Sequence, residues 1–210
     1  MMSTDASDLF PARPSTDDAT LSRLHTGLAE RAARAGLLDV AYRTIDSPVG
    51  SLLLAATPRG LVRVAYSSEN HDAILARLAA QVSARVLHAP ARLDAAAREL
   101  DEYFAGRRRT FDLPLDFQLS HGFRRAVHLH LRDIAYGDTE SYAVVAATTG
   151  NPAAVRAVGT ACATNPLPVV VPCHRVIRSD GTLGGYVGGA AAKQTLLALE
   201  SVTGRHPVII

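Results

Sequence analysis

Hydrophobic and polar positions divide the chain into a β-rich first half and a helical second half. The first twenty residues are rich in Ser, Thr, Asp and Pro, which predicts a mobile tail. Leucines then recur at helical spacing from Leu21 to Leu28, and Gly36 is typical of a helix C-cap. We therefore assign residues 1–38 to an N-terminal extension that is disordered in part and carries one helix.

Residues 39–115 have the pattern of a small α/β domain. Two β-like runs, 51–56 and 61–66, are separated by Thr-Pro-Arg-Gly and so predict a hairpin. A helix, a short strand and a second helix are expected to follow, at 74–78, 86–88 and 93–104. Arginines and a proline-containing stretch come next, and the linker between domains is placed near residues 106–119.

Residues 116–204 are predicted to form a mostly helical domain, with 205–210 as a tail. Three helices are expected, each after a candidate N-cap: Ser120, Thr139 and Asn151. The second spans 142–148, and a tight turn at 149–150 leads to the third, which is the pattern of a helix-turn-helix. The expected fold class is α+β, with a small α/β domain followed by a helix-turn-helix domain.

The third of these helices has little side-chain bulk around Arg156. Its neighbours are mostly small and include Ala157 and Gly159. A helix that reads the major groove usually carries longer polar side chains, whereas a thin helix with one long cation suits a narrow groove. An ordinary alanine-rich packed helix with a surface arginine fits the same residues, so both interpretations stay open.

Composition excludes several classes of protein. The chain has 210 residues, 48% of them hydrophobic, which suffices for one sizeable domain or two small ones. Its 22 basic and 20 acidic residues exclude a disordered polyelectrolyte and a strongly basic nucleic-acid coat. Two cysteines are too few for a disulfide framework, and the apolar runs are too short to span a bilayer. No secretory signal is visible, so we expect a cytoplasmic protein without membrane partners.

The strongest chemical signal is Cys173, which stands in a Pro-Cys-His-Arg-Val segment. The apolar run 169–171 before it predicts a buried strand, and the proline favours a tight turn. A thiolate forms at neutral pH only beside a base or a cation, which His174 or Arg175 can supply. Glu200, near the end of the last helix, can orient the imidazole. A buried, inert cysteine beside a structural histidine fits the same dipeptide, so the residues alone leave the choice open.

This segment resembles the active-site signature of the O6-alkylguanine-DNA alkyltransferases, the methylated-DNA–protein-cysteine methyltransferases. The resemblance covers roughly residues 39–203, and further segments follow the family's order and spacing: 46–50, 102–106, 136–139, 141–142, 156–159, 165–166, 185–189 and 193–200. It implies a ribonuclease H-like sheet in the N-terminal domain and a reactive cysteine in the helix-turn-helix domain.

The resemblance implies DNA repair by direct, stoichiometric alkyl transfer from O6-methylguanine in duplex DNA to Cys173, with O4-methylthymine as a further candidate substrate. The protein is then consumed in one turnover. It implies a monomer that enters the minor groove and flips the damaged base out of the duplex. No cofactor is needed, and we expect no zinc, because no cysteine precedes Cys162.

The family motif assigns a role to each matching residue. Cys173 is the alkyl acceptor, His174 a water-mediated base and Glu200 its partner. Tyr142 crowds the 3′ phosphate and bonds the flipped guanine, and Arg156 fills the vacated stack. Asn165 is the hinge between the recognition helix and the active-site loop. The remaining residues expected to contact the flipped base or the DNA are Val176, Tyr186, Ala157, Gly159 and Ser141.

Four features depart from the family pattern. His128 stands where many relatives have tryptophan, and we interpret it as a packing substitution or a pH-sensitive core group. Ala163 and Thr164 replace an arginine-glycine pair, which predicts weaker DNA binding. Val187 puts the preference for alkyl size in doubt. Cys162 is interpreted as a small buried filler, with a second reactive thiol as the alternative.

Two other classes of function remain. A damage sensor or transcription regulator would bind DNA through the helix-turn-helix without reacting, but sensing relatives lack the cysteine and combined regulators carry an additional zinc domain. A Cys–His–Glu hydrolase would turn over ester or amide substrates repeatedly, whereas an alkyl acceptor is used up.

Overall fold

The computed structural model describes residues 17–203, and both predicted terminal tails lie almost wholly outside them. A 17-residue helix, α1 (Asp18–Arg34), comes first and begins after its N-cap Asp17. The helix is where the leucine spacing predicted it, although the predicted tail was wrong for residues 18–20. Its leucines are turned outward, with Leu24 58% exposed, and the helix packs through Ala29 and Ala32 instead.

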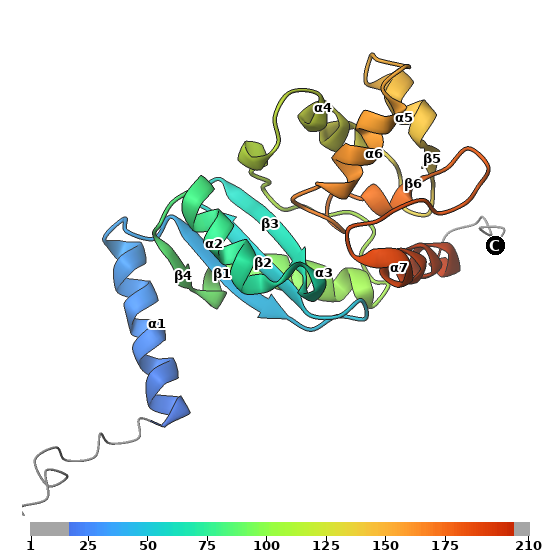
Figure 1. Ribbon diagram of the computed structural model, residues 1–210. Coiled ribbons are helices and arrows are strands. Elements are labelled where there is room, and N and C mark those ends of the chain that lie inside the picture. Colours follow the sequence, from blue (N-terminus) through green and yellow to red (C-terminus); the bar gives the residue numbers. More distant parts are fainter. Residues whose placement is uncertain (1–16, 204–210) are drawn as a thin grey trace, which may run out of the picture.

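The first half is built on a four-stranded sheet with the order β3-β2-β1-β4 (Figure 1). The strands are β1 (Val40–Ile45), β2 (Leu52–Thr57), β3 (Gly60–Tyr66) and β4 (Val86–His88). Strands β1, β2 and β3 pair antiparallel, which confirms the predicted hairpin, and β4 pairs parallel to β1. Gly60, which follows the short connection at 58–59, has positive φ, and a Cβ there would collide with the backbone of Pro114, so the position requires glycine.

Two helices cover opposite faces of this sheet, because successive side chains of a strand point to opposite sides. Helix α2 (His71–Gln81) packs Ile74 and Leu78 on one face, after the short 3-10 helix η2 (Ser67–Glu69). Helix α3 (Asp94–Phe104) follows η3 (Pro90–Leu93) and packs Leu100 on the other face. Both helices were predicted from their periodicity.

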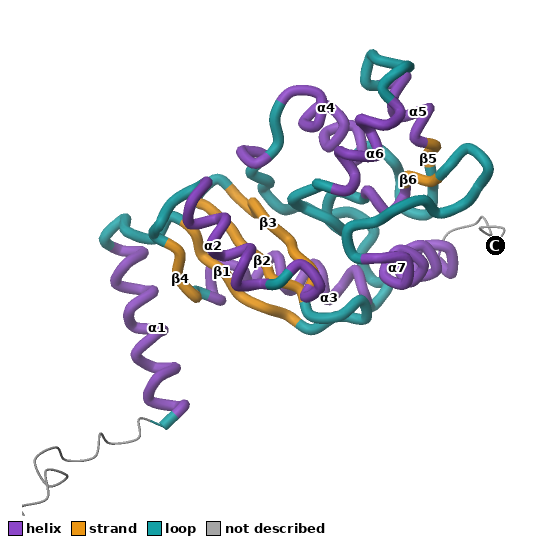
Figure 2. Tube along the Cα trace, in the orientation of Figure 1, coloured by secondary structure: helices purple, strands orange, loops and turns teal. Residues whose placement is uncertain are grey.

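The second half is mostly helical and lies beside the edge of the sheet at β3 (Figure 1). It begins with η4 (Phe117–Leu119) and α4 (Gly122–Leu131). The pair α5 (Tyr142–Thr148) and α6 (Val155–Ala163) forms the predicted helix-turn-helix, and α7 (Gly189–Thr203) closes the fold. Between α6 and α7 the chain is largely loop (Figure 2), with η5 (Cys173–Arg175) and the short strand β6 (Val176–Ile177). Strand β6 pairs parallel with β5 (Glu140–Ser141), which directly precedes α5. These elements confirm the predicted α+β class.

The predicted N-caps of the second half were wrong in position. Ser141, not Thr139, caps α5 by accepting a hydrogen bond from Val144 N at 3.2 Å. Asn151 forms a separate turn, and α6 begins after Ala154. Ser120 lies one residue before the N-cap of α4 and hydrogen-bonds a histidine side chain instead.

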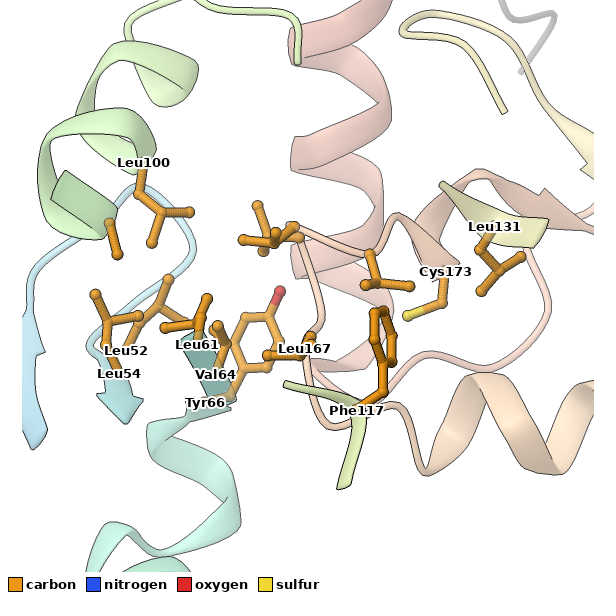
Figure 3. Packing of buried hydrophobic residues seen from close by; sticks show 14 of the residues in the cluster. Leu52, Leu54, Leu61, Val64, Tyr66, Leu100, Phe117, Leu131, Leu167 and Cys173 are labelled. Carbon is orange, nitrogen blue, oxygen red and sulfur yellow. The ribbon is translucent and has the colours of Figure 1, made fainter. Parts of the chain in front are cut away.

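One apolar cluster runs from the sheet to the second half without a break. It joins Leu54 and Tyr66 of the sheet with Leu131 of α4, Leu167 and Cys173 (Figure 3). The segments predicted as separate domains therefore share one core. Among the described residues, no helix is both long and apolar enough to cross a membrane.

Candidate active site

Cys173 lies on a buried loop that the side chain of Asn165 stabilises through hydrogen bonds. The predicted strand at 169–171 was wrong: the run makes a turn in which Val169 has φ +72°. Its apolar side chains are buried because the loop lies inside the molecule, not because a sheet covers them. Asn165 donates to Val171 O at 2.8 Å and to Cys173 Sγ at 3.1 Å, and its Oδ1 accepts from Leu167 N. This places Asn165 at the junction of α6 and the loop, and its role as a hinge stays a prediction.

The Cys173 thiol is 1% exposed, and burial raises its pKa to about 11. The hydrogen bond from Asn165 and the charge of Lys193 act in the opposite direction, because both favour the thiolate. Lys193 is the only lysine of the chain and is fully buried, donating to Val176 O at 2.6 Å and to Leu183 O. The free thiol is therefore protonated at neutral pH and needs a base to react.

His174 is the base that the geometry offers. Its ring is fully buried, and burial lowers its pKa in spite of the nearby carboxylate of Glu200. The neutral ring donates from Nε2 to Glu200 Oε1 at 2.9 Å, which leaves the lone pair on Nδ1. Nδ1 is buried and has no hydrogen-bond partner among the described residues. The ring is thus held in the tautomer that accepts a proton at Nδ1.

Glu200 is the centre of a buried network. Arg175 donates to both of its oxygens, at 2.9 and 2.8 Å, and Tyr103 donates at 2.7 Å. Burial alone would raise the pKa of Glu200, but hydrogen bonds from His174 and Arg175 outweigh it and hold that pKa well below its usual range. The hypothesis that Arg175 supports the thiolate was wrong, since its guanidinium is committed to Glu200 and to Ile134 O.

A glycine-rich loop, residues 184–188, covers the site and contacts Tyr142 and Tyr66. The hydroxyl of Tyr186 lies 2.9 Å from that of Tyr66, and its ring stands edge-on to His174 with centroids 6.3 Å apart. Tyr142 donates to Gly185 O at 3.4 Å, and burial raises its pKa to about 12. A Cβ at Gly188 would lie 2.6 Å from the Tyr66 ring, so only glycine fits there.

The predicted contact residues divide between the surface of α6 and the cysteine cluster. Arg156 and Ala157 are exposed on α6, and a Cβ at Gly159 would meet open space. Arg156 has no ion pair among the residues that the structure describes. Ser141 stands at the start of α5, next to Tyr142, and Val176 is buried beside Cys173 in β6.

Three residues of the cluster were missed by the sequence reasoning. Tyr103 and Tyr66 come from the first half of the chain, and only tertiary packing brings them to Glu200 and Tyr186. Lys193 carried one usable signal, since a single lysine among arginines marks a position where a compact ammonium is needed.

The departures from the family pattern are now placed. His128 is buried and bridges two elements, with Nδ1 2.7 Å from Ser120 Oγ and Nε2 2.8 Å from Ala161 O. Ala163 is exposed at the end of α6. Cys162 is 2% exposed, and burial strongly raises its pKa, which favours the filler interpretation. No group of three or more His, Cys, Asp or Glu within residues 17–203 is arranged to hold a metal ion.

Comparisons with known proteins give one answer for both halves of the chain. Residues 40–117 match the family model described as 6-O-methylguanine DNA methyltransferase, ribonuclease-like domain. Residues 122–202 match 6-O-methylguanine DNA methyltransferase, DNA binding domain. These ranges resemble the predicted units 39–115 and 116–204, whose exact limits stay a prediction.

Individual relatives match over most of their length. A methylated-DNA–protein-cysteine methyltransferase of Mycolicibacterium paratuberculosis is 41% identical over 161 residues, which is 77% of this chain and 92% of that protein. The constitutive enzyme of Bacillus subtilis is 40% identical over 163 residues, covering 77% and 96%.

Solved structures agree with the sequence relatives. The crystal structure of the Mycobacterium tuberculosis O6-methylguanine methyltransferase has a TM-score of 0.68 at 37% identity and covers 80% of this chain and 97% of its own. The structure of the same organism's OGT in complex with DNA gives 0.65 at 37%, covering 78% and 94%. The cysteine cluster and the helix-turn-helix both lie within the matched segments, and the chain belongs to the 6-O-methylguanine DNA methyltransferase family.

Proposed function

We propose that this protein repairs DNA by transferring the methyl group of O6-methylguanine in a duplex to its own Cys173. The observation that carries the proposal is a buried cysteine with a base beside it, on the loop that follows α6. Asn165 donates to Cys173, and the neighbouring His174 is hydrogen-bonded to Glu200. The names of the relatives support the same reaction, since they are methylated-DNA–protein-cysteine methyltransferases.

The first step is proton removal from the thiol. Nδ1 of the neutral His174 takes the proton through a bridging water, and Glu200 stabilises the imidazolium that forms. Asn165 and Lys193 stabilise the new thiolate, which offsets the rise in pKa that burial imposes on Cys173. A thiol with a raised pKa stays protonated until substrate arrives, which protects it from other electrophiles.

The second step is displacement at the methyl carbon. A carbon–sulfur bond forms as the bond between that carbon and O6 breaks, and the electron pair goes to the guanine. The Tyr142 hydroxyl, which its raised pKa keeps protonated, donates to O6 as charge develops there. The proton lost by the thiol ends on the guanine. The thioether has no good leaving group, so each chain reacts once.

DNA reaches the site by base flipping from the minor groove. Helix α6 enters the groove, where Ala157 and Gly159 permit close approach, and Arg156 occupies the space left by the flipped base. Val176 and Tyr186 line the pocket for the base. The protein acts as a monomer in the cytoplasm, where reducing conditions keep Cys173 a free thiol.

The proposal is tested by counting methyl groups removed from an O6-methylguanine duplex against protein added. We expect transfer to stop at one methyl per chain. Cys173→Ala is expected to bind the duplex and transfer nothing. Repeated turnover of an ester or amide substrate would favour the hydrolase, and tight binding by the wild type without transfer would favour the damage sensor.

The role of Arg156 is tested by Arg156→Ala. The arginine acts only when a base leaves the stack, so transfer from a duplex is expected to slow by about tenfold or more. Unstacking a base costs a few kcal/mol, and loss of the arginine removes part of the compensation for that cost. Transfer from the free base O6-methylguanine is expected to be unchanged. Equal slowing with both substrates would contradict the stack-filling role.

A further inference from the structure

A cavity of about 320 Å³ lies between the two halves of the chain, outside the cysteine cluster. Three arginines line it from three different elements: Arg63 from β3, Arg77 from α2 and Arg124 from α4. Thr164, just past the end of α6, and Val187, in the loop of Tyr186, complete its rim.

The charges in this cavity are not balanced by the protein. Its one carboxylate, Glu69, is already paired with Arg63 and accepts from Tyr66 N at 3.0 Å. Among residues 17–203, Arg77 and Arg124 have no ion pair, so three guanidinium groups face one carboxylate. Burial and the charge of Arg77 both lower the pKa of Arg63, which means that these two cations repel. An anion in the cavity relieves that repulsion.

The position of the cavity indicates which anion. It borders the end of α6, where Ala163 and Thr164 are exposed and carry no charge, and it borders the loop that closes over Cys173. The cavity thus lies between the helix to which the proposed function assigns DNA binding and the loop that closes over Cys173. A guanidinium pairs well with a phosphate oxygen, and two of the arginines are exposed enough to reach one.

We propose that Arg77 and Arg124 bind a backbone phosphate of the damaged duplex, so that α2 of the first half shares DNA binding with α6. This inference rests on the proposed function and adds a contact from outside the helix-turn-helix. The two arginines lie outside the reacting groups, and their loss is expected to weaken DNA binding and leave the chemistry intact.

The test compares Arg77→Ala, Arg124→Ala and the double variant with wild type by fluorescence anisotropy on one duplex at several salt concentrations. The double variant is expected to bind about tenfold more weakly at low salt, and its slope of log affinity against log salt is expected to fall by about 1 to 2. Arg98→Ala on α3, 64% exposed and on the opposite face of the sheet, is the matched control for loss of one charge. Its affinity is expected to stay within about twofold of wild type.

A second experiment locates the phosphate. Duplexes with one neutral methylphosphonate linkage are scanned, and at one position wild type is expected to lose affinity while the double variant does not. Unchanged affinity and salt slope in the double variant would overturn the inference. A cavity that binds inorganic phosphate but makes no contribution to duplex binding would overturn it as well. Methyl transfer at saturating duplex separates this failure from failure of the proposed function, because it tests Cys173 independently.

Discussion

At the scale of single residues, burial sets the protonation of the site in two opposite ways. It raises the pKa of Cys173 to about 11 and lowers the pKa of His174, so the two neighbours are both neutral at rest. The network on Glu200 then fixes which nitrogen of His174 carries the proton. A resting pair of neutral thiol and neutral imidazole is suited to a reagent that is used only once.

His128 provides a test of the same principle away from the chemistry. Burial lowers its pKa from 6.5, so the folded protein keeps it neutral while the unfolded chain takes up a proton as pH falls. Its contribution to stability is therefore complete above pH 6.5 and is lost as pH falls below that value, by up to about 1.4 kcal/mol per pH unit.

The measurement is the free energy of unfolding of wild type and His128→Gln between pH 7.5 and 5.5. The variant is expected to be less stable at pH 7.5 and less sensitive to acid. His25→Gln, at an exposed position on α1, is the control. Equal pH dependence in wild type and His128→Gln would contradict the account of a neutral, buried histidine.

At the scale of elements, periodicity predicted what local sequence determines. The hairpin of β2 and β3 and the bounds of α5 were correct because turn residues and apolar spacing act over a few positions. The caps and the run 169–171 were wrong for the opposite reason. The hydroxyl of Ser120 hydrogen-bonds to His128 instead of capping the helix. The valines at 169–171 are buried because their loop lies inside the molecule, which depends on residues far away in sequence.

Gly159→Ala distinguishes the two interpretations of the thin α6. A Cβ there meets nothing within 4 Å, so the free protein is expected to gain about 0.5 to 1 kcal/mol of stability from better helix propensity. If α6 enters a groove, the added methyl group overpacks that contact, and duplex binding is expected to weaken by about 1 kcal/mol or more. Higher stability with unchanged DNA affinity would identify α6 as an ordinary packed helix.

At the scale of the whole molecule, the sheet is part of the active site. The core is continuous from Leu54 to Cys173 (Figure 3). Tyr103 and Tyr66 of the first half hydrogen-bond to Glu200 and Tyr186 of the second. No local pattern predicts such contacts, since residues 97 and 120 positions apart in sequence make them. The Pro-Cys-His-Arg-Val segment, Asn165 and Glu200 were found from sequence, whereas the two tyrosines that the sheet half contributes were not.

Gly188→Ala tests this coupling. The new methyl would lie 2.6 Å from the ring of Tyr66, which is 2% exposed, so the loop or the tyrosine must move. We expect a loss of about 1 to 3 kcal/mol in unfolding free energy and slower methyl transfer. Gly185→Ala in the same loop meets nothing within 4 Å and is the matched control. Equal behaviour of the two variants in calorimetry and transfer would show that the sheet does not support the loop.

The central claim, that Cys173 itself is the methyl acceptor, is tested most directly by mapping the product. After reaction with an O6-methylguanine duplex, cleavage after Arg156 and Arg175 releases one peptide, 157–175, which holds both cysteines. Fragmentation in the mass spectrometer is predicted to place one methyl group on Cys173 and none on Cys162. A methyl group on Cys162, or an unmodified peptide from folded protein that has bound the duplex, would contradict the account.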